Sequence, residues 1–268
     1  MIELFSKDLR FENKPSSKGN QFKWENNGFW YKADYTGYEG LSEYMISHML
    51  RQSDLSEKEF VMYEPERIKY KSSIFNGAKS PNFLHDDWQI ITLERLFENS
   101  YGESLNKAIY TIKDEKERLR FLVQQTVRIT GLTDFGVYMN KLLTIDAFFL
   151  NEDRHTHNIA VLMNGQNKFL LCPIFDNGAG LLSDITLDYP VNGDIYTQIE
   201  SVKPKTFSQS FDIQLDISEE LFGRNLKFSF TKKDVTLLLN NADIYSDEIR
   251  SRVEKIIFEQ MRKYKYLF

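Results

Sequence analysis

The chain has 268 residues, of which 41% are hydrophobic and 27% are charged, as is typical of a globular protein with a sizeable core. Its formal net charge of -5 argues against general nucleic-acid binding, because neutralising phosphates requires an excess of Lys and Arg. Cys172 is the single cysteine, so a disulfide framework is excluded and a reducing compartment is expected. The sequence has neither a signal-peptide pattern nor an apolar run that would span a bilayer, so we expect a cytoplasmic protein without membrane attachment.

The first third of the chain predicts strands with one helix. Asn26-Asn27-Gly28 separates two runs rich in aromatic residues, 21–24 and 29–33, which is a strong signal for a β-hairpin. Apolar residues at helical spacing predict an amphipathic helix over 41–50. Further short strands are expected over 60–63 and 74–75, before the turn residues of 80–87.

The remainder of the chain is predicted to be mainly helical. A short helix is expected over 90–98, and Asp114 is expected to begin a helix that ends before Gly131. The next helix is capped by Thr133 or Asp134, and apolar residues crowd nearly all its faces up to Leu150, so it should be central and buried.

Two apolar runs then predict adjacent strands. They cover 159–163 and 169–172 and are joined by the turn residues 164–167. A loop-rich region over 187–223 and a last helix over about 246–264 complete the expected order.

Three oxygen-bearing side chains lie around the predicted strand pair. Asp153 and Asn158 occupy a short polar segment before the first run, and Asp176 comes where the second run ends. Adjacent strands would bring all three to one edge of a hairpin. Phosphoryl transfer from ATP requires such a set, in which one carboxylate orients the acceptor hydroxyl while an Asn and a second carboxylate hold Mg²⁺. The pattern therefore predicts a kinase.

Other interpretations of the same residues exist. His155 and His157, with Asp153 and Asp176, are ligand types that suit a hydrolytic metal site, although side chains two residues apart reach one ion only from an extended segment. A nucleotide-binding module without catalysis is a third class, and ordinary loop capping would explain the polar residues individually. The coincidence of residue types and spacing beside a buried helix favours the kinase.

The segment Asp153-Arg154-His155-Thr156-His157-Asn158 resembles the catalytic loop of the HipA-like serine/threonine kinases, in which a second Asp also ends a strand downstream. Eukaryotic protein kinases place His and Arg before the catalytic Asp, so the order here points away from them. Lipid kinases of the phosphatidylinositol class share an Asp-Arg-His-x-x-Asn loop, so a lipid or other small-molecule kinase remains the alternative.

The resemblance implies roles for individual residues. Asp153 would accept or orient the hydroxyl proton, and Asn158 and Asp176 would coordinate Mg²⁺. Lys32 would contact the α and β phosphates of ATP, with Glu43 paired to it from the following helix. Glu39 is a rival for the pairing, and Lys23 is a rival for the phosphate contact. Replacing Lys32 by Met is expected to leave the fold intact.

The resemblance also implies an α+β fold with two lobes like those of protein kinases. We expect a small β-rich lobe over residues 1–84 and a helical lobe over 85–268, with the adenine near Asn82 and Phe83. The segment 14–20 would be the phosphate loop, and its Ser16 and Ser17 are the expected sites of autophosphorylation, which would switch the kinase off.

HipA proteins usually carry an additional N-terminal subdomain, so this chain would be a stand-alone kinase core. The expected function is Mg-ATP-dependent phosphorylation of serine or threonine in a protein substrate. The resemblance further implies a toxin of a toxin–antitoxin pair, with a small antitoxin or regulatory protein as partner.

Overall fold

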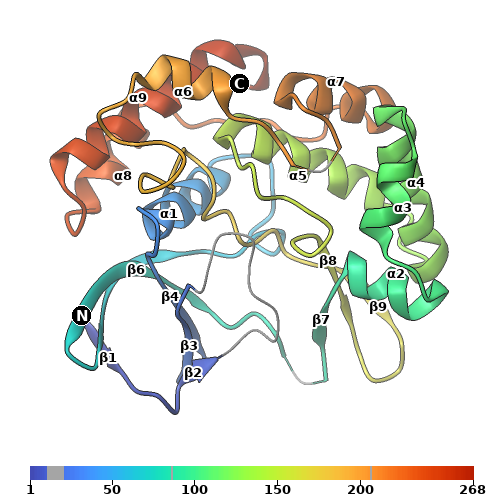
Figure 1. Cartoon of the computed structure of the whole chain (residues 1–268), viewed down its shortest axis with the longest axis horizontal. Coiled ribbons are helices and arrows are strands. Elements are labelled where there is room, and N and C mark those ends of the chain that lie inside the picture. Colours follow the sequence, from blue (N-terminus) through green and yellow to red (C-terminus); the bar gives the residue numbers. More distant parts are fainter. Residues whose placement is uncertain (11–20, 86, 206) are drawn as a thin grey trace. The chain divides into compact units, whose positions relative to one another are not determined.

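The computed structural model describes residues 1–10, 21–85, 87–205 and 207–268 (Figure 1). The chain divides into two compact units. The first comprises Met1–Phe83, Phe175–Val202 and Lys227–Phe268, and the second comprises Leu84–Ile174 and Lys203–Leu226. The first change of unit falls at the expected boundary near residue 84. The division is nevertheless not contiguous, because two later segments pack with the N-terminal residues.

A mixed sheet forms the centre of the first unit. In the part of the chain that the structure describes, it has six strands in the order β1-β5-β6-β4-β3-β2. Only β1 and β5 are parallel. The strands are β1 (Ile2–Leu4), β2 (Leu9–Arg10), β3 (Lys23–Asn26), β4 (Phe29–Ala33), β5 (Glu64–Tyr70) and β6 (Ser73–Pro81).

The predicted hairpin is confirmed as β3 and β4. Asn26 pairs with Phe29 across the turn, and Asn27 and Gly28 have φ of 51° and 78°, the left-handed values that a tight two-residue hairpin requires. Tyr31 and Ala33 of β4 join a buried cluster on one face of the sheet. Because side chains alternate along a strand, Lys32 lies on the opposite face.

Helix α1 (Glu39–Leu50) confirms the helix predicted over 41–50. Two glycines let it approach the sheet closely: a Cβ added at Gly40 would lie 2.4 Å from the carbonyl carbon of Gly77 in β6. A larger residue at Gly40 would push the helix away from β6, whereas one at Gly77 would collide with the backbone oxygen of Lys32 in β4. The remaining helical elements of this unit are α6 (Ile195–Ser201), α8 (Lys232–Asn241), α9 (Asp247–Lys263) and the 3-10 turn η1 (Lys265–Leu267).

The second unit combines an antiparallel sheet with helices. Its described strands have the order β7-β8-β9, and the predicted strand pair is confirmed as β8 and β9. The strands are β7 (Gln89–Thr92), β8 (Ala160–Met163) and β9 (Phe169–Leu171), and the helices are α2 (Leu93–Tyr101), α3 (Leu105–Thr111), α4 (Glu115–Thr130), α5 (Phe135–Phe149) and α7 (Phe211–Phe222).

The predicted caps and the buried helix of this unit are largely confirmed. Asp114 caps α4 by accepting a hydrogen bond from the backbone N–H of Glu117 at 2.9 Å. Asp134 precedes α5 without a side-chain capping bond. Most of α5 is buried, including the charged Asp146, and it ends at Leu150, whose φ is 57°. This helix leads directly into the polar segment 151–158.

Three expectations from the sequence are wrong. The strand predicted over 60–63 instead begins at Glu64, because the charged residues of β5 hide its alternation. The helix predicted over 90–98 begins only at Leu93, because residues 89–92 form strand β7, as their β-branched side chains favour. The region 187–223 contains α6 and α7 rather than loops alone. Among the described residues, no helix is both long enough and apolar enough to cross a membrane.

Candidate functional site

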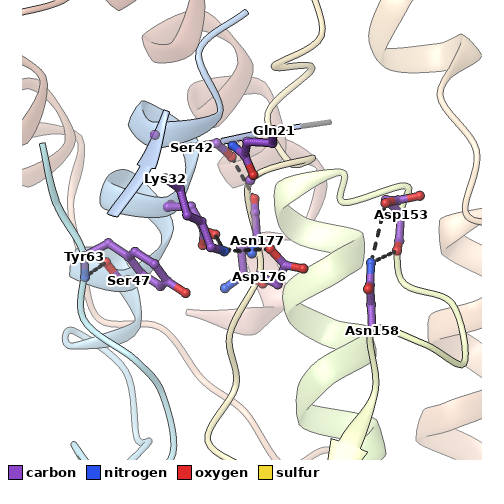
Figure 2. A network of polar contacts seen from close by, with 12 residues as sticks. Gln21, Lys32, Ser42, Ser47, Tyr63, Asp153, Asn158, Asp176 and Asn177 are labelled. Atoms are coloured by element: carbon purple, nitrogen blue, oxygen red, sulfur yellow. Dashed lines mark hydrogen bonds and ion pairs between the residues drawn. The ribbon is translucent and has the colours of Figure 1, made fainter. Parts of the chain in front are cut away.

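A cluster of three charged residues, of which Glu43 is buried and Lys32 and Asp176 are partly buried, lies in the first unit. Lys32 Nζ is 2.7 Å from Glu43 Oε1 and 2.7 Å from Asp176 Oδ1. The side chains are 13%, 2% and 28% exposed for Lys32, Glu43 and Asp176. Figure 2 shows Lys32 directed toward Asp176 and Asn177. The structure therefore brings together three residues that the sequence assigned to nucleotide and metal binding.

Helix α1 holds this cluster in place through two neighbouring side chains. Glu43 uses its second oxygen, Oε2, to accept the backbone N–H of Asn177 at 2.8 Å. Ser42 Oγ donates to the carbonyl oxygen of Asn177 at 3.0 Å. Glu43 thus binds the lysine of β4 and the Asp176 segment at once, and the close contact of Gly40 with Gly77 sets its position.

The rival pairing with Glu39 does not occur. Glu39 accepts hydrogen bonds from the backbone N–H groups of Tyr35, Thr36 and Gly37 at 2.8–3.2 Å, so its carboxylate closes the turn before α1. Lys23 lies opposite Lys32 in the strand register. The contacts with Glu43 and Asp176 are those of Lys32.

The three charged groups change one another's pKa values. Burial alone would lower the pKa of Lys32, but the charges of Asp176 and Glu43 outweigh it and raise that pKa well above its usual value. Burial raises the pKa of Glu43, while Lys32 opposes the rise. With both carboxylates ionised, two negative charges surround one positive charge. The cluster therefore carries one negative charge in excess, which a metal cation would neutralise.

The backbone around Asp176 is strained. Asp176 has a φ of 60°, and Leu181 and Leu182 both have a φ of 55°, values that side-chain-bearing residues rarely adopt. Both leucines are fully buried. Phe175 packs against Phe83 at a ring-centroid distance of 6.0 Å. Packing on both sides of Asp176 thus holds a conformation that its own backbone disfavours.

The residues expected near the adenine lie in the first unit. The Asn82 backbone N–H donates to the carbonyl of Gly28 at 2.8 Å, which fixes it beside the β3–β4 turn. Phe83 packs with Phe175 on a buried cluster that includes Tyr63. Ser16 and Ser17, with the whole segment 14–20, lie outside the described residues.

The residues expected to form the catalytic loop, Asp153 and Asn158, lie in the second unit. Asn158 Nδ2 donates to the backbone oxygen of Asp153 at 2.9 Å and lies 3.5 Å from its Oδ2. Figure 2 shows these two side chains directed toward each other. Lys205 Nζ donates to Asp153 Oδ1 at 2.8 Å. Asp176 belongs to the other unit, so the meeting of all three oxygen-bearing side chains stays a prediction.

A buried ion pair supports this loop. The guanidinium of Arg154 contacts both carboxylate oxygens of Asp146 at 3.1–3.2 Å and donates to the carbonyl oxygen of Asn158 at 3.1 Å. Arg154 and Asp146 are 4% and 0% exposed. Arg154 therefore ties both ends of the segment between Asp153 and Asn158 to α5. The pair escaped sequence analysis, although an Asp in the last turn of an apolar helix is a signal that a partner is required.

Glu94 of α2 supports the same loop from another side. Its carboxylate accepts hydrogen bonds from Ser104 Oγ at 2.5 Å, the Asn106 backbone at 2.9 Å and Thr156 Oγ1 at 2.8 Å. Burial alone would raise the pKa of Glu94, but these hydrogen bonds lower it. Sequence analysis did not identify Glu94 or Lys205, because both depend on contacts between distant segments.

His155 and His157 are not arranged as ligands of one metal ion in the part of the chain that the structure describes. The backbone N–H of His157 donates to His155 Nδ1 at 3.2 Å, which makes that nitrogen part of the loop's own hydrogen bonding. His155 Nε2 lies 3.9 Å from Asp153 Oδ1. Within the described ranges, no group of three or more His, Cys, Asp or Glu side chains is arranged to hold a metal ion.

The cluster predicts the effect of replacing Lys32. Lys32→Met would leave Glu43 buried without its cation, so the free energy of unfolding should fall by about 3–5 kcal/mol at neutral pH. The expectation of an intact fold is therefore revised. Because the pKa of Lys32 is raised in the folded state, the stabilisation is complete at neutral pH and is lost only as the pH rises through that raised value. Denaturant titration of the purified variant measures the loss.

A double variant is the matched control. Lys32→Met combined with Glu43→Gln removes both charges, so most of the lost stability should return. Equal losses in the single and double variants would contradict the burial of an unpaired carboxylate as the cause.

Comparison with known proteins bears on the fold. No protein-family model matches the sequence, and no curated protein matches it significantly. Among the solved structures that match is the crystal structure of a Helicobacter pylori proinflammatory kinase, CtkA, with a TM-score of 0.63 and 15% sequence identity. The match covers 99% of this chain and 96% of that chain. The chain therefore has a kinase-like α+β fold, with a β-rich N-terminal part and a helical C-terminal part.

Proposed function

We propose that this protein is a Mg-ATP-dependent phosphotransferase, a serine/threonine protein kinase of the HipA-like type. The observation that carries the proposal is the buried contact of Lys32 with both Glu43 and Asp176 in a kinase-like fold. A lysine between a helix carboxylate and the carboxylate of a strained loop serves phosphate and metal binding together. The resemblance of segment 153–158 to the HipA-like loop supports the type.

Nucleotide binding is assigned to the first unit. Lys32 contacts the α and β phosphates, and Glu43 holds the lysine in its extended position. Asn82 and Phe83 lie beside the adenine in this proposal. Mg²⁺ fits the oxygen donors, because the cluster around Asp176 carries an excess negative charge and hard cations prefer carboxylate and amide oxygens.

Asn158 is the second proposed metal ligand. Its amide nitrogen is engaged by Asp153, which leaves Oδ1 as the atom for the metal. Bound Mg²⁺ would neutralise the charge of the phosphates. Asp153 orients the hydroxyl of the acceptor and takes its proton, while the hydroxyl oxygen bonds to the γ-phosphorus and ADP leaves.

The acceptor in this proposal is a serine or threonine of a protein, including Ser16 and Ser17 of the chain itself. HipA-like kinases suggest a toxin with a small antitoxin or regulatory partner, acting in the cytoplasm. The proinflammatory character of the Helicobacter pylori kinase is a property of that protein alone. A lipid or small-molecule kinase is the alternative, since segment 153–158 has the corresponding order of residues.

The metal assignment predicts how Asp176→Asn behaves. The variant lacks the charge that neutralises Mg²⁺, so the rise in melting temperature on adding Mg-ATP should be mostly lost. Thermal unfolding with ATP, with and without Mg²⁺, measures this rise. The matched control is Asp216→Asn on the exposed face of α7, which should keep the full rise.

A full Mg-ATP effect in Asp176→Asn would contradict the metal assignment. Stoichiometric zinc in the purified protein, together with no effect of ATP, would instead support a hydrolase that uses His155 and His157.

Autophosphorylation tests the catalytic residue. Protein incubated with Mg-ATP should gain whole phosphate units in its intact mass, and peptide mapping should place them at Ser16 or Ser17. The added charge near the nucleotide should then slow further transfer, because like charges repel. Asp153→Asn should gain no phosphate, since it cannot take the hydroxyl proton.

The outcomes separate the parts of this proposal. Equal phosphate gain in wild type and Asp153→Asn would count against Asp153 as the catalytic residue. Phosphate confined to other positions would count only against the loop switch. Transfer to an inositol lipid, without transfer to protein, would support the lipid kinase.

A further inference from the structure

Lys205 is a cation beside the proposed catalytic aspartate, and it comes from a distant part of the sequence. Its Nζ donates to Asp153 Oδ1 at 2.8 Å. We propose that Lys205 is a positioning residue for phosphoryl transfer, which holds the Asp153 carboxylate in the orientation that receives the acceptor hydroxyl. This inference rests on the proposed function and extends its machinery beyond segment 153–158.

The backbone around Lys205 is held in place by the helical part of the second unit. Tyr110 of α3 donates from its hydroxyl to the carbonyl oxygen of Lys205 at 2.7 Å. Arg118 of α4 donates to the carbonyl oxygens of Ile112 at 2.6 Å and Phe207 at 3.4 Å. The guanidinium of Arg118 also lies 5.8 Å from the centre of the Tyr110 ring.

These contacts anchor the segment on both sides of the lysine. Phe207 is 2% exposed, and Pro204 is buried. The backbone of Lys205 is thus fixed by α3 and α4, while its side chain reaches the loop that follows α5. Because the backbone is fixed, the ammonium group of Lys205 can reach only a limited set of positions, as a positioning role requires.

Stability alone gives little reason for this contact. The side chain of Lys205 is 40% exposed and that of Asp153 is 15% exposed, and ion pairs of such exposure contribute little to the free energy of folding. The contact does constrain the aspartate: Asn158 Nδ2 lies 3.5 Å from Asp153 Oδ2, and Lys205 Nζ donates to Oδ1 at 2.8 Å. The two contacts together limit the rotation of the side chain.

The neighbouring cations do not replace Lys205 in this role. Arg154 is adjacent to Asp153 in sequence, but its guanidinium is buried against Asp146. His155 Nε2 is 3.9 Å from Asp153 Oδ1, beyond hydrogen-bond distance, and carries a charge only when protonated. Lys205 Nζ donates directly to the carboxylate, at 2.8 Å.

The step that Lys205 supports is balanced without a further reactant. The acceptor oxygen forms a bond to the γ-phosphorus, the bond from that phosphorus to the β-phosphate oxygen breaks, and ADP leaves. The hydroxyl proton passes to Asp153 and then to solvent. Lys205 takes no part in the proton transfer and acts by orienting Asp153.

Steady-state kinetics of ADP formation test the inference. Lys205→Met should lower kcat by about 10- to 100-fold, because a small misplacement of a reacting group has effects of that size. KM for ATP and the melting temperature should stay close to those of wild type, since nucleotide binding is assigned to the other unit. Lys203→Met, an exposed lysine on the same segment, is the matched control and should keep wild-type kcat.

Chemical rescue separates the charge from the rest of the side chain. Lys205→Cys should have the low kcat of the Met variant, and alkylation with bromoethylamine should restore most of it by rebuilding an ammonium of nearly the same length. The natural Cys172 is 2% exposed, so the folded protein should react mainly at position 205. Wild type treated with the reagent controls for modification elsewhere.

The failures of the two proposals can be told apart. If wild type forms no ADP above a protein-free blank, the proposed function is wrong and the role of Lys205 falls with it. If wild type and Asp153→Asn form ADP at the same rate, Asp153 is not the catalytic residue and Lys205 has no reacting group to position. If wild type exceeds Asp153→Asn while Lys205→Met keeps the wild-type kcat, only the role of Lys205 is wrong. An equal loss of kcat in Lys203→Met, or alkylation that restores nothing, would also overturn it.

Discussion

The contact on which the candidate site depends is the buried ion cluster of Lys32, Glu43 and Asp176. A lysine that loses its hydration must be matched by carboxylates within hydrogen-bond distance, and both lie at 2.7 Å. Glu43 also binds the backbone of Asn177, so the strand, the helix and the segment that carries Asp176 are joined by these charges. A change in any of the three groups alters the environment of the other two.

In the second unit, buried charges support the loop that carries Asp153 and Asn158. Its loop from Asp153 to Asn158 is supported by Arg154, whose charge is paired with Asp146, and by Thr156, which binds Glu94. The residues proposed for chemistry are partly exposed, while the residues that hold the loop are buried. Neighbouring residues of this short segment therefore have different roles: Arg154 and Thr156 hold the loop, and Asp153 and Asn158 are the residues proposed for chemistry.

Sequence analysis recovered the features that are local in the chain. The Asn27-Gly28 turn, the cap at Asp114 and the buried helix before segment 151–158 each follow from residues within a few positions of one another. The pairing of Lys32 with Glu43 was also expected, from the resemblance to HipA-like kinases, with Glu39 as the rival. Strand β5 was missed because its charged residues mask the alternation. Lys205 was missed because nothing near it in sequence indicates that its segment contacts α3 and α4 or that its side chain contacts Asp153.

The left-handed backbone at Asp176, Leu181 and Leu182 has a consequence for heating and for denaturants. The strain in this segment is balanced by the burial of the two leucines and by the bonds from α1, so the segment keeps its shape only while that packing is intact. A small local opening would let Asp176 relax and release Lys32 before the sheet itself comes apart. The proposed metal and nucleotide binding should then be lost before global unfolding, while the protein is still largely folded.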